Sequence, residues 1–319
     1  MRIMIIGGGS LGLLFASKMA AYCSQLTVVT RTREQAIELT RVGITRNERE
    51  SQEHVNESSL SFCSYIDEMN VDRTLNTPNP RLDYIFLMVK QTAITSELLQ
   101  FIQNHISIAT YLVSFQNGIG HEWKLSQAIG EDRLLLAVTT EGAKRNGYTA
   151  VNHTGHGITY IGEMASNEEG AEHNQHNLLV QVLEQAGFQT VLSKNMEVRV
   201  WSKLAINAVI NPLTALLRMR NGELLESAWT LDLMNDLYQE VQSVAYAQGI
   251  RLPDDLWDTI LGVCEATSRN HSSMLQDIEA SRHTEVDYMN GSLLRLAKES
   301  DLSLPTHSMI YRMIKALEK

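Results

Sequence analysis

A glycine-rich turn, G-x-G-x-x-G at Gly7, Gly9 and Gly12, constrains this chain more than any other feature of its sequence. The turn follows an apolar run at Arg2–Ile6 and opens a helical stretch at Leu11–Ala21. In such a turn the first glycine permits a tight bend, the second lets a pyrophosphate approach the backbone, and the third lets helix and strand pack closely. Free N–H groups at the start of the helix then bind the phosphates. We therefore predict a dinucleotide site with contacts from Gly7, Gly8, Gly9, Ser10, Leu11 and Gly12.

The end of the second predicted strand indicates which dinucleotide binds. A chain that binds NAD usually carries an acidic residue about 20 residues past the glycine loop, where it holds the ribose 2′-hydroxyl. This chain carries Thr30-Arg31-Thr32-Arg33 there instead. Because a guanidinium can bind a 2′-phosphate through paired, charge-assisted hydrogen bonds, we predict NADPH/NADP+ as the cofactor. Arg31 is the first choice for that contact and Arg33 the second, the alternative being solvated arginines at a strand end.

The first 193 residues alternate β-branched runs with helical patterns, which is typical of βαβ units. The strands we expect are Arg2–Ile6, Leu26–Thr30, Tyr84–Val89, Leu112–Phe115, Leu134–Thr139, Gly157–Ile161 and Phe188–Leu192. The fold class is therefore α/β, with a Rossmann-type, doubly wound parallel sheet in an amino-terminal domain. Two polar segments, Arg46–Ser59 and Ser166–His173, are predicted to be solvated loops or hairpin tips.

From Lys194 onward apolar residues recur at helical spacing and the strand pattern disappears. The expected helices are Val198–Ile210, Trp229–Gln248, Asp254–Ser268 and Ala280–Lys298. A length of 319 residues is enough for two domains, so we predict a dinucleotide-binding domain at 1–193 and an all-α substrate domain at 194–319. A cleft where two domains meet is a usual place for a small-molecule site.

Charge and hydropathy exclude several classes of partner. The net charge of -10 argues against binding to nucleic acid. No uninterrupted apolar run approaches the length of a membrane helix, and no signal-peptide pattern opens the chain, so we expect a cytoplasmic protein without a membrane partner. A homodimer is compatible with the sequence. The three cysteines, Cys23, Cys63 and Cys264, are expected to be reduced packing residues.

Two polar residues are expected at the edge of the sheet that carries the glycine loop. Lys90 follows the strand at Tyr84–Val89, and Asn117 follows the strand at Leu112–Phe115. Ligands of open α/β sheets bind at the carboxyl ends of strands, so both residues are candidates for a shared site, although either alone is more often an ordinary loop residue.

A helix in the last third of the chain carries a polar stripe. Lys203, Asn207 and Asn211 are spaced i, i+4, i+8 and therefore share one face of an otherwise apolar helix. A buried ammonium needs partners, and the oxygens of a substrate could supply them. A polar stripe in a domain interface is the alternative. Pro212 follows directly, so we expect a bend or break near Asn211.

Further candidates lie closer to the carboxyl terminus. Ser272 or Ser273 could cap a helix, and Glu285 could orient a lysine or a hydroxyl, or instead pair with Arg282 on the surface. Four histidines resemble a metal cluster, but they lack supporting carboxylates in the sequence, so we expect no metal site: His153, His156, His173 and His176.

Several of these segments together resemble the ketopantoate reductase (2-dehydropantoate 2-reductase) family. They are Gly7–Gly12, the strand end at Lys90, Gln116–Gly120, Lys203–Ala215, Asn221–Leu224, Ser272–Asp277 and Arg282–Glu285, in order over nearly the whole chain. The resemblance implies NADPH-dependent reduction of 2-dehydropantoate to (R)-pantoate, a step toward pantothenate and coenzyme A.

The resemblance also implies roles for single residues. Lys203 would be the general acid, and Glu285 would fix the substrate and the lysine. The remaining contacts would be Asn207, Asn211 and Ser273 to substrate oxygens, Lys90 and Asn117 on the nicotinamide side, Arg31 on the 2′-phosphate, and Asn221 as a turn residue or a substrate contact. Two alternatives stay open: a reductase of another branched 2-keto acid, and a regulator that binds NADPH without turnover.

Overall fold

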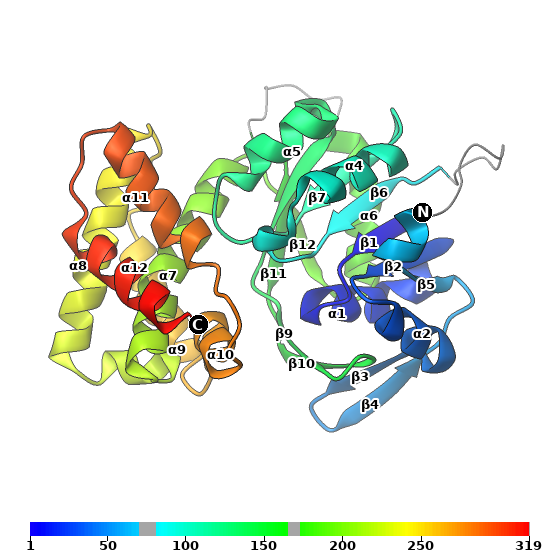
Figure 1. Ribbon diagram of the computed structural model, residues 1–319, viewed down its shortest axis with the longest axis horizontal. Coiled ribbons are helices and arrows are strands. Elements are labelled where there is room, and N and C mark those ends of the chain that lie inside the picture. The colour runs from blue at the N-terminus through cyan, green and yellow to red at the C-terminus, as the bar shows by residue number, and fades with distance from the viewer. Residues whose placement is uncertain (70–80, 165–172, 319) are drawn as a thin grey trace. The chain divides into compact units, whose positions relative to one another are not determined.

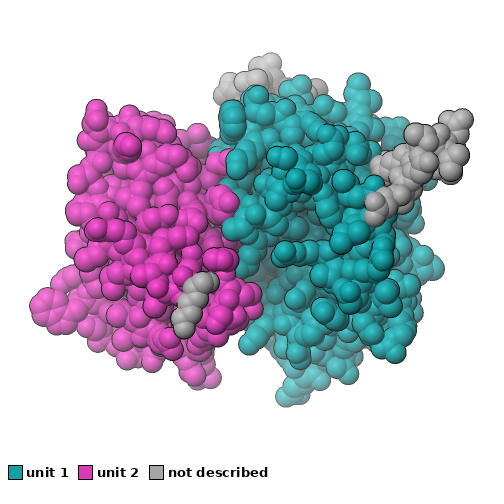
Figure 2. Space-filling model, in the orientation of Figure 1, with its two compact units in different colours: residues 1–116, 121–196 teal, residues 117–120, 197–319 magenta. Residues whose placement is uncertain are grey.

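The computed structural model describes residues 1–69, 81–164 and 173–318. The chain divides into two compact units, one made of residues 1–116 and 121–196 and one made of residues 117–120 and 197–319 (Figure 2). The second unit therefore begins three residues after the expected boundary at residue 193, and it also includes a short segment, Asn117–Gly120, from the middle of the first.

The first unit is built on an eight-stranded sheet that is mostly parallel. Its order is β12-β11-β8-β7-β6-β1-β2-β5, and within it only β11 and β8 pair antiparallel (Figure 1). The strands are β1 (Arg2–Ile6), β2 (Gln25–Thr30), β5 (Leu60–Ser64), β6 (Tyr84–Leu87), β7 (Tyr111–Ser114), β8 (Leu134–Thr139), β11 (Ile158–Gly162) and β12 (Gln189–Leu192). After β1 the chain adds β2 and then β5 on one side of this strand. It then returns to the other side, where β6, β7 and β8 follow in order. The sheet therefore has its topological switch point beside β1, where ligands of such folds bind.

Helices connect and cover these strands. They are α1 (Ser10–Met19), α2 (Arg33–Val42), α3 (Tyr65–Met69), α4 (Ser96–His105), α5 (His121–Ile129) and α6 (His173–Gln185), with short 3-10 turns η1 (Ala20–Tyr22), η2 (Gln91–Ala93) and η3 (Glu131–Arg133). The core lies under α1, where the rings of Phe15 and Phe188 stack with centroids 4.1 Å apart. The prediction of an α/β, Rossmann-type unit is confirmed.

A second sheet, which the sequence analysis did not predict, packs against α1. It has the order β4-β3-β10-β9, from β3 (Ile44–Glu48), β4 (Ser51–Val55), β9 (Gly142–Asn146) and β10 (Ala150–Gly155). The polar Arg46–Ser59 segment was predicted to be a solvated loop or a hairpin tip, and it does contain a hairpin, formed by β3 and β4. This hairpin belongs to the second sheet, because β3 also pairs with β10. Exposed β4 is polar throughout most of its length, which hides its strand character in the sequence. Most of Ser166–His173 lies outside the described residues.

The second unit is helical, as predicted. Its helices are α7 (Met196–Leu217), α8 (Ala228–Ala247), α9 (Leu256–Ala266), α10 (Ser273–Glu279), α11 (Asn290–Glu299) and α12 (Pro305–Leu317), with 3-10 turns η4 (Asn221–Leu225) and η5 (Val286–Tyr288). In the described part of the chain, α7 alone is long and apolar enough to cross a membrane, but 67% of its most apolar window is buried within the fold. Such burial is typical of the core helix of a globular domain.

Two predictions about helix boundaries in this unit were wrong. Of the bend or break expected near Asn211, the break does not occur, because α7 continues through Pro212 to Leu217. A proline at this position removes the bond to the carbonyl of Ala208, four residues earlier. Asn290 Nδ2 donates to that carbonyl oxygen at 3.0 Å, which replaces the lost partner.

The second error is the continuous helix predicted over Ala280–Lys298. The chain instead leaves α10 at Glu279, passes Ser281 with φ 51°, and does not resume an α-helix until Asn290. Thr284 explains part of the interruption, because its Oγ1 accepts from the backbone N–H of Val286 at 3.2 Å and also donates to Glu318. Glu285 therefore lies in a connecting segment rather than within a helix.

Candidate functional site

The glycine loop adopts a conformation that requires glycine at its two ends. Gly7 has φ +126°, where side chains are rarely tolerated, and a Cβ on Gly12 would lie 1.9 Å from the carbonyl oxygen of Gly7. A Cβ on Gly9, in contrast, would meet no atom within 4 Å. Packing of the chain against itself thus explains Gly7 and Gly12, whereas the space at Gly9 is open to a ligand.

The start of α1 beside this loop carries no side-chain cap. Gly9 is the N-cap residue and provides no capping oxygen, so the first N–H groups of the helix have no side-chain acceptor. Such groups, together with the positive end of the helix dipole, favour an anion. The loop and the helix start therefore fit the pyrophosphate of a dinucleotide.

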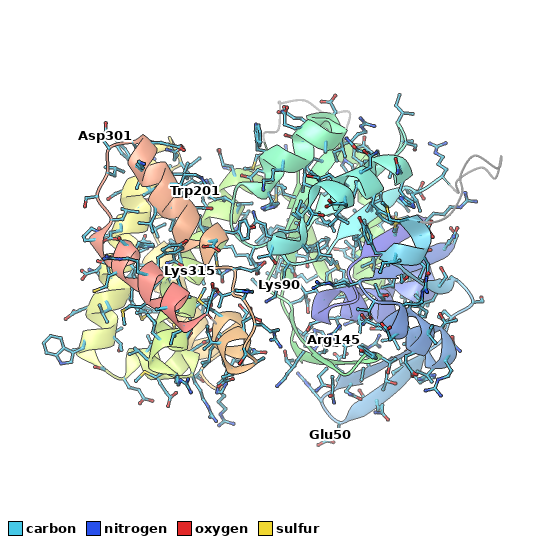
Figure 3. All side chains as sticks on the ribbon, viewed as in Figure 1. Glu50, Lys90, Arg145, Trp201, Asp301 and Lys315 are labelled. Atoms are coloured by element: carbon cyan, nitrogen blue, oxygen red, sulfur yellow. The ribbon has the colours of Figure 1, made fainter. Side chains whose placement is uncertain are left out.

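Two side chains that the sequence analysis did not single out hold the loop in place. Arg145 on β9 donates from Nη1 to the carbonyl oxygen of Gly8 at 2.9 Å, and its backbone N–H donates to Ser10 Oγ at 3.0 Å (Figure 3). Gln35 Nε2 donates to the same Gly8 oxygen at 2.8 Å and to the carbonyl of Tyr148 at 3.0 Å. No local pattern reveals these contacts, since Arg145 and Gly8 are 137 residues apart.

The two arginines at the end of β2 have different surroundings. Arg33 forms an ion pair with Asp67, which raises the pKa of Arg33 and lowers that of Asp67. Arg31 is exposed and, among the described residues, makes no hydrogen bond or ion pair. Its guanidinium can therefore bind an added phosphate without breaking an existing contact, which favours Arg31 over Arg33.

The carboxyl ends of β6 and β7 carry the next candidates. Lys90 is exposed, follows β6 and precedes η2 (Figure 3). Buried Gln116 joins the two strand ends, because its Nε2 donates to the carbonyl oxygens of Leu87 at 2.9 Å and Val89 at 2.8 Å. Gln116 thereby fixes the chain one residue before Asn117.

In the second unit, three candidates from distant parts of the sequence come together. Asn117 Nδ2 donates to Glu285 Oε2 at 3.3 Å, across 168 residues of sequence. Burial lowers the pKa of Lys203 to about 8, and the negative charge of Glu285 opposes that shift. An amide, a carboxylate and an ammonium therefore share one site, and the ammonium loses its proton more readily than a free lysine would.

The segment that carries Glu285 is anchored by the last helix. The backbone N–H and Oγ1 of Thr284 donate to Glu318 Oε1 at 2.8 Å and 2.6 Å. Glu318 also pairs with Lys315 of α12, the two charged groups being 2.6 Å apart. Arg282, the surface partner considered for Glu285, instead pairs with Asp277 at 3.0 Å.

The remaining substrate candidates differ in their surroundings. On unbroken α7, Asn207 is partly exposed and Asn211 is buried, on the same face as Lys203. Ser272 caps α10, accepting from the N–H of Leu275, whereas Ser273 is exposed. Asn221 lies in η4, where its Nδ2 donates to Thr267 Oγ1 at 2.8 Å and its buried Oδ1 has no partner among the described residues.

Comparison with known families decides the relationship of this chain. The family model described as ketopantoate reductase PanE/ApbA matches residues 3–166, and the model of its carboxyl-terminal domain matches residues 195–318. The chain belongs to the ketopantoate reductase family. It is thus an oxidoreductase of that family.

Individual proteins of known sequence or structure are similar to this member of the ketopantoate reductase family over its whole length. A Bacillus subtilis 2-dehydropantoate 2-reductase is 33% identical over 100% of this chain and 98% of its own length. The crystal structure of a probable 2-dehydropantoate 2-reductase from Bacillus subtilis has a TM-score of 0.79 at 30% identity and covers 100% of both chains. D-mandelate dehydrogenase, solved with NADH and anilino(oxo)acetate, has a TM-score of 0.86 at 22% identity, covering 100% of this chain and 98% of that one, and shows the shared fold.

The four histidines that resembled a metal cluster in the sequence do not all lie together among the described residues. His176 hydrogen-bonds Tyr84 at 3.1 Å, and the side chain of His173 lies outside the described residues. His153 and His156 lie close together and, contrary to the reasoning from sequence, have a carboxylate between them, which Glu48 supplies from β3.

Proposed function

We propose that this chain is an NADPH-dependent 2-dehydropantoate 2-reductase. It would reduce ketopantoate to (R)-pantoate in the cytoplasm, on the route to pantothenate and coenzyme A. The observation that carries the proposal is the grouping of Lys203, Glu285 and Asn117 within a chain of the ketopantoate reductase family. Relatives named 2-dehydropantoate 2-reductase support the choice of substrate.

The cofactor supplies a hydride to the keto carbon when it is bound. The glycine loop and the start of α1 would hold its pyrophosphate, Arg31 its 2′-phosphate, and Lys90 would lie on its nicotinamide side together with Asn117. The open space at Gly9 and the guanidinium of Arg31, which has no partner in the described part of the chain, fit these roles. Arg145 adds a second positive group beside the loop, which an anionic ligand needs in a chain of net charge -10.

Lys203 would act as the general acid. As negative charge develops on the keto oxygen, an ammonium within about 3 Å stabilises it and donates a proton. Glu285 keeps Lys203 protonated near neutral pH, because its charge raises the lysine pKa against the effect of burial. Asn117 Nδ2 donates to Glu285 Oε2 and would thereby help to hold the carboxylate whose charge acts on Lys203.

Asn207, Asn211 and Ser273 would bind the carboxylate and hydroxyl oxygens of the substrate, and Asn221 either contacts it or shapes the η4 turn. These amides and hydroxyls donate without adding net charge, so the anionic substrate would be neutralised chiefly by the lysine. Lys203 keeps partial access to solvent, from which it can regain its proton after each turnover.

The test is an absorbance assay of NADPH consumption by the purified protein. We expect turnover with ketopantoate, much weaker turnover with ketoisovalerate or benzoylformate, and a lower kcat/KM with NADH than with NADPH. Preference for another of these acids would replace the proposed substrate and keep the reaction class. Absence of turnover with every keto acid, alongside measurable NADPH binding, would overturn the proposal in favour of a regulator.

A further inference from the structure

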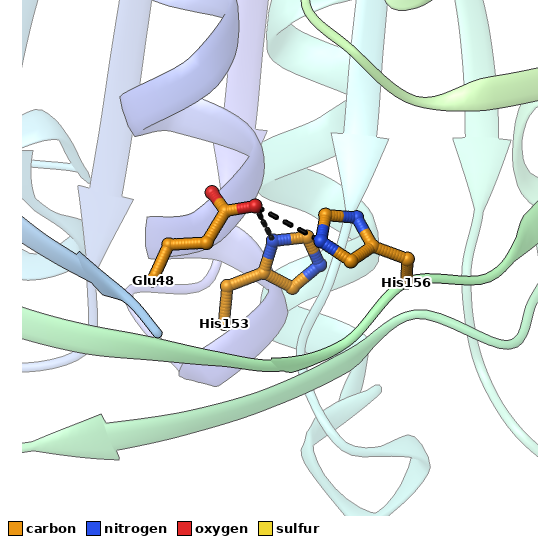
Figure 4. Close-up of side chains that lie close together, drawn as sticks. All are labelled: Glu48, His153 and His156. Carbon is orange, nitrogen blue, oxygen red and sulfur yellow. Dashed lines mark ion pairs between the residues drawn. The ribbon is translucent and has the colours of Figure 1, made fainter. Parts of the chain in front are cut away.

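A cluster of two histidines and a glutamate lies at the end of the second sheet, apart from the residues given roles above. Glu48 ends β3, His153 stands opposite it in the register on β10, and His156 follows in the turn before β11 (Figure 4). Glu48 Oε1 is 3.5 Å from His153 Nδ1 and 2.9 Å from His156 Nε2. The three atoms all lie within 4.8 Å of one another.

The surroundings of His153 define which of its nitrogens is free to bind. Its Nε2 lies 2.6 Å from Glu141 Oε2, and both side chains are almost fully buried. If Nε2–H donates to that carboxylate, the neutral ring carries its lone pair on Nδ1. On its other side, the buried Nδ1 of His153 meets no well-formed hydrogen bond among the described residues, and it lies 3.5 Å from Glu48 Oε1. A lone pair on Nδ1 turned toward a carboxylate oxygen is unfavourable, so this arrangement favours a cation between the two atoms.

Two of the three separations between ligand atoms in the cluster are close to those of a metal site, and the third, between His153 Nδ1 and His156 Nε2, does not exceed 4.8 Å. With metal–nitrogen and metal–oxygen bonds of about 2.0–2.2 Å, a tetrahedral site places its ligand atoms about 3.3 Å apart. The separations of 3.5 Å and 2.9 Å lie on either side of this value. The contact from Glu141 to His153 is the outer carboxylate that metal-binding histidines usually have.

Two positive side chains, Lys18 and Arg46, act on Glu48, and the Arg46 contact leaves Oε1 for this purpose. Arg46 Nε lies 3.9 Å from Oε2 of Glu48, on the oxygen that does not face the histidines, and Arg46 also pairs with Glu53. Oε1 therefore remains directed at both rings. His156 is 54% exposed at its side chain, which gives an ion a path to the site from solvent.

We propose that Glu48, His153 and His156 bind a divalent first-row transition metal ion, for which Zn2+ is the probe. Two imidazoles and one carboxylate suit zinc, and a water would complete four-coordination on the exposed side. His156 would bind through Nε2 and carry its hydrogen on Nδ1, so the present contact from Nε2 to Glu48 would be exchanged for the two metal bonds.

Such an ion would stabilise the second sheet. It would join the end of β3, β10 and the turn after it. Glu48 and His153 are 105 positions apart in the sequence, and closing a loop of that length is entropically costly. The same sheet carries Arg145 and leads into Tyr148, which brace the glycine loop. Metal binding would thus add rigidity on the side of the first unit that supports the phosphates.

The test is calorimetric titration of Zn2+ into the full-length protein after treatment with a chelator. We expect one Zn2+ per chain, with affinity lowered at least tenfold in His156→Asn and in Glu48→Gln. His54→Asn is the matched control, because His54 is an exposed histidine on β4 of the same sheet. It should bind Zn2+ as the unaltered chain does.

Thermal unfolding provides the second measurement. Zn2+ should raise the Tm of the unaltered chain and of His54→Asn, but not that of His156→Asn, whose exposed position leaves folding intact. The proposal is overturned if the unaltered chain binds no stoichiometric Zn2+, or if His156→Asn binds it equally well. Neither result depends on whether the chain reduces ketopantoate, which the absorbance assay decides separately.

Discussion

The two units of this protein build their sites in opposite ways. The first unit uses six consecutive residues, Gly7–Gly12, and mainly their backbone, whereas the second unit joins the side chains of Asn117, Lys203 and Glu285 from three separate segments. A backbone site depends on local φ values and on the absence of side chains, so residue spacing reveals it. A side-chain site depends on packing between distant segments. Residue spacing can therefore identify candidate residues, but it does not predict that they lie close together in the folded protein.

The strongest test of the side-chain site is Lys203→Ala. Without the ammonium, no group protonates the keto oxygen, and we expect kcat to fall about 10²–10⁴-fold with little change in NADPH affinity. Steady-state kinetics and a fluorescence titration with NADPH measure the two effects. Lys298→Ala, which removes an exposed lysine of α11, is the control. Near-normal kcat in Lys203→Ala would refute the assignment.

For the backbone site, Gly9→Ala separates ligand space from folding. A Cβ at Gly9 meets no atom of the described residues within 4 Å, so thermal stability should stay within about 0.5 kcal/mol of the unaltered chain. The same methyl group would stand where we expect the pyrophosphate, and KM for NADPH should rise at least about tenfold, which is about 1.4 kcal/mol.

Gly12→Ala provides the contrast. Its Cβ would collide with the backbone of Gly7, so this variant should lose about 1–3 kcal/mol of unfolding free energy, measured by urea denaturation. If Gly9→Ala binds NADPH normally while folding normally, the pyrophosphate does not lie at Gly9.

Arg31→Ala tests the part of the cofactor site that does depend on a side chain. Loss of a charge-assisted contact worth about 1.5–3 kcal/mol should raise KM for NADPH about 10- to 100-fold and leave KM for NADH nearly unchanged. Arg33→Ala is the matched control, since Arg33 is engaged by Asp67. Equal losses for both cofactors in Arg31→Ala would exclude the 2′-phosphate contact.

The pH profile should show the smallest effect. Reduction needs the ammonium form of Lys203, whose pKa is about 8, so kcat/KM should be full below that pH and fall as pH rises through it. Glu285 raises the pKa of Lys203, and Glu285→Gln should therefore move this alkaline decline to lower pH, beyond any loss in rate at the optimum. A decline at unchanged pH would mean that another group titrates.

Several features of the fold were predictable because they are local. The seven predicted strands are present, and Gly7 has the positive φ that a tight turn requires. Helical spacing alone places Lys203, Asn207 and Asn211 on one face, because α7 is continuous through all three residues. One failed prediction has a distant partner as its cause. Pro212 stays inside α7 because Asn290, 82 residues from Ala208, satisfies the freed carbonyl.

The sites show the same division. The sequence ranked Arg31 ahead of Arg33 for the 2′-phosphate, and the ion pair of Arg33 with Asp67 supplies a structural reason for that order. The histidines at 153 and 156 lacked a carboxylate nearby in the chain, and the register of β10 on β3 places Glu48 beside them.

The order of residues by itself determined the phosphate-binding turn, the helical face that bears the lysine, and the α/β-then-α plan, because each follows from backbone geometry over a few neighbouring positions. The three-dimensional structure alone decided which charges are paired, how far the pKa of Lys203 is lowered, and which acidic groups face which bases. Those properties depend on desolvation and on distances between segments, and neither quantity is set until the chain has packed.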